Sequence, residues 1–149
     1  MADENILDLM LNHHALLWTL FISFRDAARE NSPDTAKAFS ELKWETKKHF
    51  FTEENAIFDY IPMKNMGVLE TINQLKDEHI TMLGQLENIS NSLPELKIEV
   101  VDKFQYLLES HREMEEKKLY PKLDKELNKI QKHQIVSRIE QIPISNYKK

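Results

Sequence analysis

The sequence predicts an all-α fold, and this helical class follows from a few simple observations. Apolar residues recur at three- and four-residue spacing along most of the 149 residues. Only two glycines occur, Gly67 and Gly84, fewer than the turns of a strand-rich fold usually need. A chain of this length fits one domain, so we expect a single domain over residues 1–142 and a frayed tail over 143–149.

Three breaker segments divide the chain into the predicted helices. They are Asn31-Ser32-Pro33-Asp34, Ile61-Pro62 through Gly67, and Ser90-Asn91-Ser92-Leu93-Pro94. A proline just after a serine is typical of a helix start. We therefore expect helices near residues 4–30, 34–61, 66–90 and 95–120, and short connections between them favour antiparallel neighbours in an up-down-up-down four-helix bundle.

A shorter helical segment is expected to follow the bundle. Pro121 opens this segment, which extends to about Ile139. Its apolar residues predict a short extra C-terminal helix that docks outside the bundle, through Leu123, Leu127, Ile130, Ile135 and Ile139.

Composition and charge exclude several classes of function. The formal charge of −5 and the scattered lysines give no basic stripe, which disfavours nucleic acid as a partner. No stretch approaches the roughly 20 uninterrupted apolar residues of a membrane span, and the start Met-Ala-Asp-Glu-Asn lacks the basic region of a signal peptide. We therefore expect a cytoplasmic protein with no membrane partner. Because the chain has no cysteine, any metal ion must be bound by imidazole and carboxylate groups.

Two copies of one pattern carry the chemistry, His49-Phe-Phe-Thr-Glu53-Glu54 and His111-Arg-Glu-Met-Glu115-Glu116. Each copy puts a histidine and a glutamate four residues apart, which on an α-helix places them on one face. That face is otherwise mostly apolar, with Phe39, Leu42, Thr46, Ile57 and Tyr60 in the first copy and Val101, Phe104, Leu108 and Leu119 in the second. A buried glutamate is costly unless a counter-charge or a metal ion offsets its desolvation. The repeat therefore predicts a buried metal centre.

The two remaining helices each offer a histidine to the same centre. His79 lies on the apolar stripe of the helix expected over residues 66–90. The first helix is apolar around most of its circumference, so His13 and His14 both flank its buried direction, and periodicity does not choose between them. At about 1.5 Å per residue, counting outward from the turns brings these histidines to similar heights in the bundle. Four imidazoles and two carboxylates should then meet near its middle.

This set of ligands is the composition of a carboxylate-bridged dinuclear site. If Glu53 and Glu115 bridge two ions and each ion takes two histidines, an oxo or hydroxo bridge brings each ion to five ligands. One position per ion then stays open for a small molecule. Iron suits the site best because N/O ligation allows ferrous–ferric cycling, and manganese or zinc are the substitutes, zinc without redox use.

The spacing His-x3-Glu-Glu-x2-Ile/Leu-Phe/Tyr, which ends at Phe58 in one copy and at Tyr120 in the other, resembles the hemerythrin-like (HHE) cation-binding domain family. The segment Lys76-Asp77-Glu78-His79 resembles the third helix of the family. Aligning the surroundings of His14 with those of His79 makes His14, not His13, the family ligand. The resemblance implies a di-iron centre that binds O2, NO or related species, with the metal ligands His14, His49, Glu53, His79, His111 and Glu115.

The chain differs from the oxygen-carrying hemerythrins, which have His-x3-His on the third helix and His-x4-Asp on the fourth. Here leucines lie one turn on either side of His79, and the fourth helix offers Glu115 at x3 and Glu116 at x4. The sequence is more similar to the H–HxxxE–H–HxxxE subclass. That subclass includes di-iron proteins linked to iron–sulfur repair and nitric-oxide stress.

We expect a non-haem di-iron protein that binds or senses a diatomic ligand, O2 or NO. The same centre would serve an enzyme that reduces NO or peroxide or that repairs iron–sulfur clusters, and a metal-free helical interaction module is the third hypothesis. One open coordination position serves carrier, sensor and enzyme alike, so the sequence leaves these open, together with the oligomeric state.

Several neighbouring residues are given simpler roles. Glu54 and Glu116 lie about 100° off the buried stripe, so we expect them to be solvated or to orient a ligand histidine. His133 is expected at the surface. The larger side chains at helical spacing are expected to pack in the core first and to line a ligand pocket second, and they are Trp18, Phe21, Phe58, Met82 and Tyr120.

Overall fold

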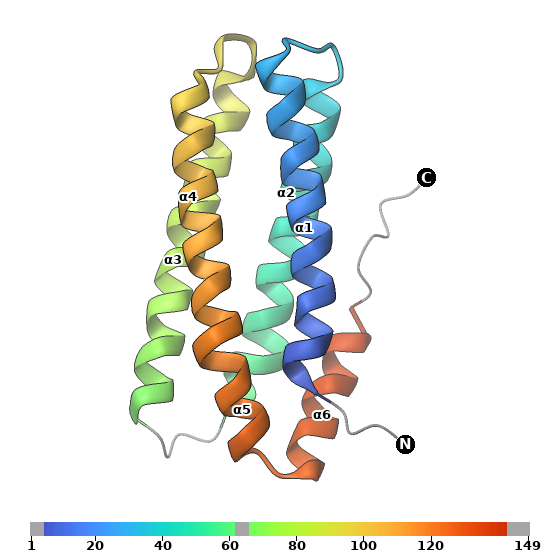
Figure 1. Cartoon of the computed structure of the whole chain (residues 1–149), viewed down its shortest axis with the longest axis vertical. Coiled ribbons are helices and arrows are strands. Elements are labelled where there is room, and N and C mark those ends of the chain that lie inside the picture. The colour runs from blue at the N-terminus through green and yellow to red at the C-terminus, as the bar shows by residue number, and fades with distance from the viewer. Residues whose placement is uncertain (1–4, 62–65, 143–149) are drawn as a thin grey trace.

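A computed structural model describes residues 5–61 and 66–142 of the chain (Figure 1). Four long helices form an antiparallel bundle, and they are α1 (Ile6–Arg29), α2 (Thr35–Thr52), α3 (Met66–Ser92) and α4 (Ile98–Met114). A 3-10 turn over Leu93–Glu95 precedes α4. The described residues contain no strand. The predicted all-α four-helix bundle is therefore confirmed, whereas the expected frayed tail over 143–149 lies outside the described residues.

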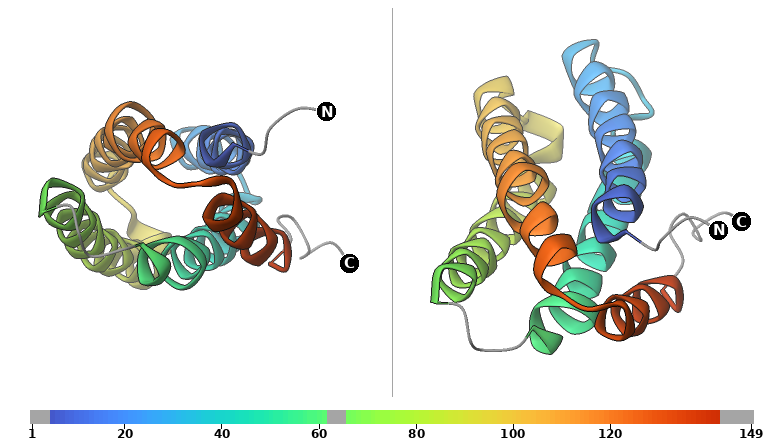
Figure 2. Two further views of the ribbon diagram at one scale, coloured as in Figure 1. Left: turned by 90° about the horizontal axis from the view of Figure 1, so that it is seen from below. Right: turned by 60° about the horizontal axis from the view of Figure 1, so that its bottom comes forward.

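The C-terminal part forms two helices that follow α4. Helix α5 (Tyr120–Glu126) continues from α4 through a π-helical turn, and α6 (Lys129–Glu140) packs against α1 and the π turn that follows α2 (Figures 1 and 2). Leu127 separates the two helices because its backbone is extended, with φ −81° and ψ 144°. Of the apolar residues expected to dock this segment, Ile130 is instead exposed, since α6 turns its Ile135 and Ile139 inward.

Both repeated motifs lead into a π-helical turn, over Glu53–Ile57 and Glu115–Leu119. The backbone N–H of Phe58 donates to the carbonyl of Glu53, and that of Tyr120 donates to the carbonyl of Glu115, five residues earlier in each case. The wider turn lets two consecutive side chains face the core, so Phe58 and Tyr120 are both buried beside a buried neighbour. The periodicity did not predict these turns, because two neighbouring apolar residues are also compatible with a regular α-helix.

Helix α2 and its π turn end in a 3-10 turn over Phe58–Tyr60. The sequence placed Tyr60 on the buried stripe, but its side chain is 49% exposed. The π turn shifts the phase of the helix before Tyr60 is reached, and the ring lies against the guanidinium of Arg138 from α6. The stripe predicted from the sequence therefore holds as far as the π turn and fails after it.

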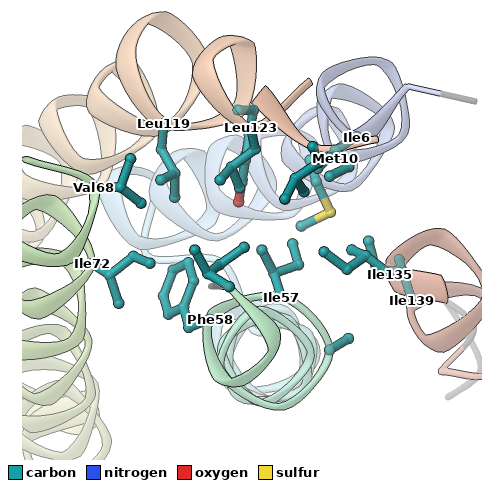
Figure 3. Close-up of a cluster of buried hydrophobic side chains, with 14 of the residues drawn as sticks. Ile6, Met10, Ile57, Phe58, Val68, Ile72, Leu119, Leu123, Ile135 and Ile139 are labelled. Atoms are coloured by element: carbon teal, nitrogen blue, oxygen red, sulfur yellow. The ribbon is translucent and has the colours of Figure 1, made fainter. Parts of the chain in front are cut away.

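Apolar side chains form two clusters, one toward each end of the bundle. The lower cluster joins α1, α3, α5, α6 and the π turn after α2 (Figure 3), and it includes Ile6, Met10, Ile57, Phe58, Ile72, Leu123 and Ile135. The upper cluster joins the four long helices and includes Phe21, Phe24, Phe39, Leu42, Leu86 and Phe104. Along each helix the buried histidines and glutamates lie between these two clusters. The bundle therefore contains a buried polar layer enclosed by apolar packing.

Helix α1 is, among the described helices, the one that is long and apolar enough to cross a membrane by length and composition. The core helix of a soluble protein meets the same criterion. Here α1 buries Met10, Leu17 and Phe21 against the other helices. Its composition is accounted for by its place in the bundle.

Asp124 of α5 caps the N-terminus of α1, far away in the sequence. Its Oδ1 accepts a hydrogen bond from the N–H of Ile6 at 2.8 Å, and its Oδ2 accepts one from the N–H of Leu7 at 3.0 Å. The side chain of Asn5 accepts a third, from the N–H of Asp8. These N–H groups have no partner within a helix, so the side chains satisfy donors that burial would otherwise penalise. The cap also sets the height of α1 relative to α5.

Replacing Asp124 by alanine should lower the free energy of unfolding by about 1–2 kcal/mol, because two N–H donors at the start of α1 lose their acceptor. Urea unfolding measures the change. Asp77→Ala on the exposed face of α3 is the matched control and should shift stability by less than about 0.5 kcal/mol. Equal effects of the two substitutions would show that the cap contributes nothing specific.

Candidate metal centre

The six residues predicted as metal ligands lie together in the middle of the bundle. One histidine comes from each long helix, and the two glutamates are the first residues of the two π turns. All six are buried, and the two glutamates are 0% exposed. They are His14, His49, Glu53, His79, His111 and Glu115.

The ligand atoms of these residues form two groups that share both carboxylates. One group contains His14 and His49, and the other contains His79 and His111. Glu53 and Glu115 belong to both groups, and within each group the ligand atoms lie within 4.8 Å of one another. Two metal-sized groups with a common pair of carboxylates suit two ions side by side.

Glu53 turns one carboxylate oxygen toward each pair of histidines. Its Oε2 lies 3.3 Å from Nε2 of His49 and 4.0 Å from Nε2 of His14. Its Oε1 lies 2.9 Å from Nε2 of His79 and 3.9 Å from Nε2 of His111. A carboxylate in this position has one oxygen available to each of two ions.

Glu115 repeats this arrangement from the opposite π turn. Its Oε1 lies 3.0 Å from Nε2 of His14, and its Oε2 lies 3.0 Å from Nε2 of His111. These short contacts are not hydrogen bonds in geometry, since both carboxylate oxygens and both Nε2 atoms are buried without a hydrogen-bond partner among the described residues. Unpaired buried polar atoms are costly. Together with the all-N/O donor set, they fit a pair of cations.

Three of the four histidines are oriented by a further carboxylate. Nδ1 of His14 lies 2.7 Å from Glu116, and Nδ1 of His79 lies 2.7 Å from Glu54. Both glutamates directly follow one of the shared carboxylates in the sequence. Hydrogen bonds at Nδ1 fix the ring so that Nε2 faces the centre. Of the two roles expected for Glu54 and Glu116, orientation of a histidine is the one observed.

Glu78 orients the third histidine, and sequence reasoning missed this role. Its Oε1 lies 2.8 Å from Nδ1 of His111, and this contact lowers the pKa of Glu78. Glu78 directly precedes His79, and this position beside a candidate ligand is the feature of the sequence that could have indicated the role. The partner, however, is on α4, so the contact depends on how α3 and α4 pack.

His49 differs from the other three histidines, because its Nδ1 is buried without a hydrogen-bond partner among the described residues. It lies beside a cavity of about 10 Å³ that His13, Glu45, Lys48 and Thr52 help to line. Glu45 is 2% exposed, with its Oε2 3.2 Å from Nζ of Lys48. The sequence analysis did not identify Glu45, which lies one turn before His49 on α2.

His13 is buried next to the centre but is absent from both groups of ligand atoms. Burial, and then the nearby His49 and His14, lower the pKa of His13 to about 3. It is therefore a neutral imidazole at neutral pH. The geometry agrees with the family alignment, which selected His14.

Tyr120 closes the lower side of the centre. Its side chain is fully buried, and its hydroxyl donates a hydrogen bond to Oε2 of Glu53. Burial, and then the charges of Glu115 and Glu53, raise the pKa of Tyr120 well above 10, so the phenol stays protonated. The sequence predicted packing as the first role of Tyr120, and the structure adds a hydrogen bond to a shared carboxylate.

A second cavity, of about 20 Å³, opens onto the centre between α1, α2 and α4. Four of the candidate ligands line it. They are His14 and His49 from one group, His111 from the other, and Glu115, which belongs to both. The other lining residues are Leu17, Trp18, Phe50, Leu108 and Arg112. The predicted role of Trp18 in lining a pocket is thus observed, whereas Phe21, Phe58 and Met82 are buried in the apolar clusters.

Protons balance the buried carboxylates where no metal ion is bound. Burial lowers the pKa of His14 and of His111, but contacts with Glu115 and other carboxylates raise both well above 6.5. For His79, burial is likewise outweighed, chiefly by Glu53. Burial raises the pKa of Glu53, and the surrounding imidazoles, His49 first, bring it well below 4.5. Protonated imidazoles thus supply the positive charge that two metal ions would otherwise supply.

The stability of the metal-free protein should therefore fall as the pH rises above about 6.5. Unfolded histidines lose their protons near pH 6.5, whereas folded His14, His79 and His111 keep theirs to higher pH. The stabilisation is full below pH 6.5 and is lost as the pH rises through the folded pKa values. Each protonated histidine should remove about 1.4 kcal/mol per pH unit until it titrates. Folded His13 is neutral throughout, so the loss of its proton in the unfolded state opposes this fall only near pH 6.5.

Urea unfolding across this pH range, in the presence of a chelator, measures the effect. His14→Gln should reduce the slope, because one of the three histidines with a raised pKa is then absent. A free energy of unfolding that stays flat or rises with pH would contradict the proton balance described above.

The family of the chain follows from comparison with known proteins. Residues 5–123, most of the chain and all six candidate ligands, match the family model of the Hemerythrin HHE cation binding domain. No curated protein and no solved structure matches the chain. The matched segment includes both repeated motifs and all four long helices. The chain therefore belongs to the hemerythrin HHE cation-binding domain family.

Proposed function

We propose that this protein is a non-haem di-iron protein that binds or senses a small diatomic ligand, O2 or NO. The observation that carries the proposal is the position of Glu53 and Glu115. Glu53 has one oxygen toward His14 and His49 and the other toward His79 and His111. Glu115 has one oxygen toward His14 and the other toward His111. Such carboxylates are suited to bridge two ions. Their full burial makes a purely structural role as a metal-free interaction module costly.

In this proposal His14 and His49 would hold one ion, His79 and His111 would hold the other, and both ions would share Glu53 and Glu115. Two iron ions would supply redox-active metal with an open coordination position for a small molecule, and manganese or zinc are the substitutes. Glu115 rather than Glu116 in the bridging position favours the H–HxxxE–H–HxxxE subclass. Glu116, Glu54 and Glu78 hold three imidazoles in the orientation that binding requires.

The cavity beside the centre supports a diatomic ligand. Its volume of about 20 Å³ admits a molecule of a few non-hydrogen atoms, which suits a diatomic gas. Leu17, Phe50 and Leu108 give it apolar walls, which suit a weakly polar gas.

The same lining favours binding over reduction. Reduction of NO or of peroxide consumes protons, so an enzyme needs a group that delivers them to the ligand. Apart from the candidate metal ligands, the residues that line the cavity are apolar except for Trp18 and Arg112, and a guanidinium does not give up its proton. The hydroxyl of Tyr120 donates its proton in a hydrogen bond to Glu53, and Tyr120 is not among the residues that line the cavity.

A cytoplasmic location and the lack of membrane or nucleic-acid partners stay predictions from composition.

Purified protein produced with iron available should contain about two iron ions per chain, because six buried N and O ligands exceed what a lone ion uses. Elemental analysis measures the metal. Anaerobic reduction followed by exposure to O2 or NO should then produce an absorption band that disappears on removal of the gas. A content near zero or one ion per chain contradicts the dinuclear site, and bleaching with formation of product supports the enzyme instead.

Two pairs of sequence neighbours test which residues bind the metal. Glu115→Ala and His14→Ala should abolish loading with two ions, because each removes a buried ligand. Glu116→Ala and His13→Ala are the matched controls and should still load two ions at saturating metal. Glu116→Ala should weaken metal affinity by about 10- to 100-fold, since His14 loses its orienting carboxylate.

The reverse result at either pair is informative. Loss of metal only in the Glu116 variant would favour the asymmetric geometry of the oxygen carriers. Loss only in the His13 variant would mean that α1 is rotated relative to the structure described here.

A further inference from the structure

The cavity beside the centre has one partly exposed side. Of the nine residues that line it, seven are buried, and they are His14, Leu17, His49, Phe50, Leu108, His111 and Glu115. The other two, Trp18 and Arg112, are partly exposed. A molecule that enters this cavity from solvent must therefore pass these two side chains.

Trp18 and Arg112 also contact each other across the cavity. The guanidinium carbon of Arg112 lies 5.5 Å from the centroid of the Trp18 ring, within the range of a cation–π interaction. Trp18 lies on α1, one turn after His14, and Arg112 lies on α4, directly after His111. The pair thus joins two helices that each carry a candidate metal ligand.

The two partners differ in how firmly they are held. The Trp18 ring stacks on Phe21, with centroids 5.7 Å apart, and Phe21 is fully buried in the upper apolar cluster. Arg112 has a long side chain with many rotamers and a head group that favours water. Movement of Arg112 away from a fixed indole would open the cavity without any change in the bundle.

We propose that Trp18 and Arg112 form a gate that controls entry to the metal centre and favours small anions. The proposal rests on the function proposed above, because it concerns access to the same site. The net charge of the chain is −5, so its overall field repels anions. A guanidinium at the mouth of an apolar cavity supplies a local positive charge against that field. Neutral O2 and NO gain nothing from this charge.

Azide is a suitable anionic probe, and O2 is the neutral one. With iron-loaded protein, stopped-flow spectroscopy gives the association and dissociation rates of azide with the oxidised protein and of O2 with the reduced protein. Arg112→Gln should slow azide association about tenfold relative to O2 association. Trp18→Leu should raise the association and dissociation rates of both probes by a similar factor and leave their Kd values nearly unchanged, because a gate alters rates and not the bound state.

Two matched controls lie away from the cavity. Arg138→Gln removes an arginine that stacks on Tyr60 at 3.4 Å, so it repeats the loss of charge and of the cation–π contact. Trp44→Leu removes the other tryptophan, which is 52% exposed on α2. Both controls should keep the rates of the unmodified protein. Urea unfolding of each variant shows whether the fold is retained.

A further measurement needs no metal. In metal-free protein with Trp44→Phe, Trp18 is the one remaining tryptophan, so its fluorescence reports on the gate alone. Iodide should quench this fluorescence more than caesium does, and Arg112→Gln should remove the difference while quenching by neutral acrylamide increases. Equal quenching by iodide with and without Arg112 would overturn the electrostatic part of the gate.

The outcomes separate this inference from the proposed function. If O2 or NO binds but the Arg112 and Trp18 variants match their controls, the gate is wrong and the function stands. If azide binds at rates that depend on Arg112 while neither gas binds, the gate stands and the diatomic function is wrong. A protein that takes up no iron overturns both.

Discussion

The burial of two carboxylates is the constraint on which the centre depends. Glu53 and Glu115 have no exposed surface, and unpaired charges at that depth would be costly. Each of the four long helices therefore contributes an imidazole to the layer between the apolar clusters. Protons on His14, His79 and His111 balance the charge where metal is absent, and cations would balance it where metal is bound. The same atoms thus link the stability of the bundle to its capacity to bind metal.

The π turns place these carboxylates and the groups beneath them. Each turn starts at a shared glutamate whose side chain points into the centre. At the end of each turn two successive side chains are buried in the lower part of the bundle, Ile57 and Phe58 in one and Leu119 and Tyr120 in the other. Tyr120 reaches Glu53 in this way, and the helix continues into α5. Asp124 on α5 then caps α1, which connects the height of His14 to the turn that carries Glu115. The positions of the candidate ligands therefore depend on the packing at the lower end of the bundle.

The surroundings of the centre are not symmetric, although its ligands are. Three imidazoles have an orienting carboxylate, whereas His49 borders a small cavity instead. The cavity of about 20 Å³ opens on the side of α1 and α4, where Trp18 and Arg112 contact each other. Tyr120, which is not among the residues that line this cavity, donates a hydrogen bond to Glu53. A ligand would therefore approach both metal positions from one direction. The repeated motifs supply the two shared carboxylates. Residues outside the repeat, such as Trp18 and Arg112, line the cavity through which a small molecule would reach the centre.

The sequence by itself determined the helices, the topology and five of the six residues that meet in the middle, because a 3.6-residue period and short connections mark which faces are buried and which helices are neighbours. Tertiary structure decided the rest. The partnership of Glu78 with His111 and the burial of Glu45 depend on helix-to-helix contacts that a period within one helix does not contain. The exposure of Tyr60 follows from a π turn that changes the helical phase. His14, not His13, faces the centre because the rotation of α1 is set by its packing against all its neighbours.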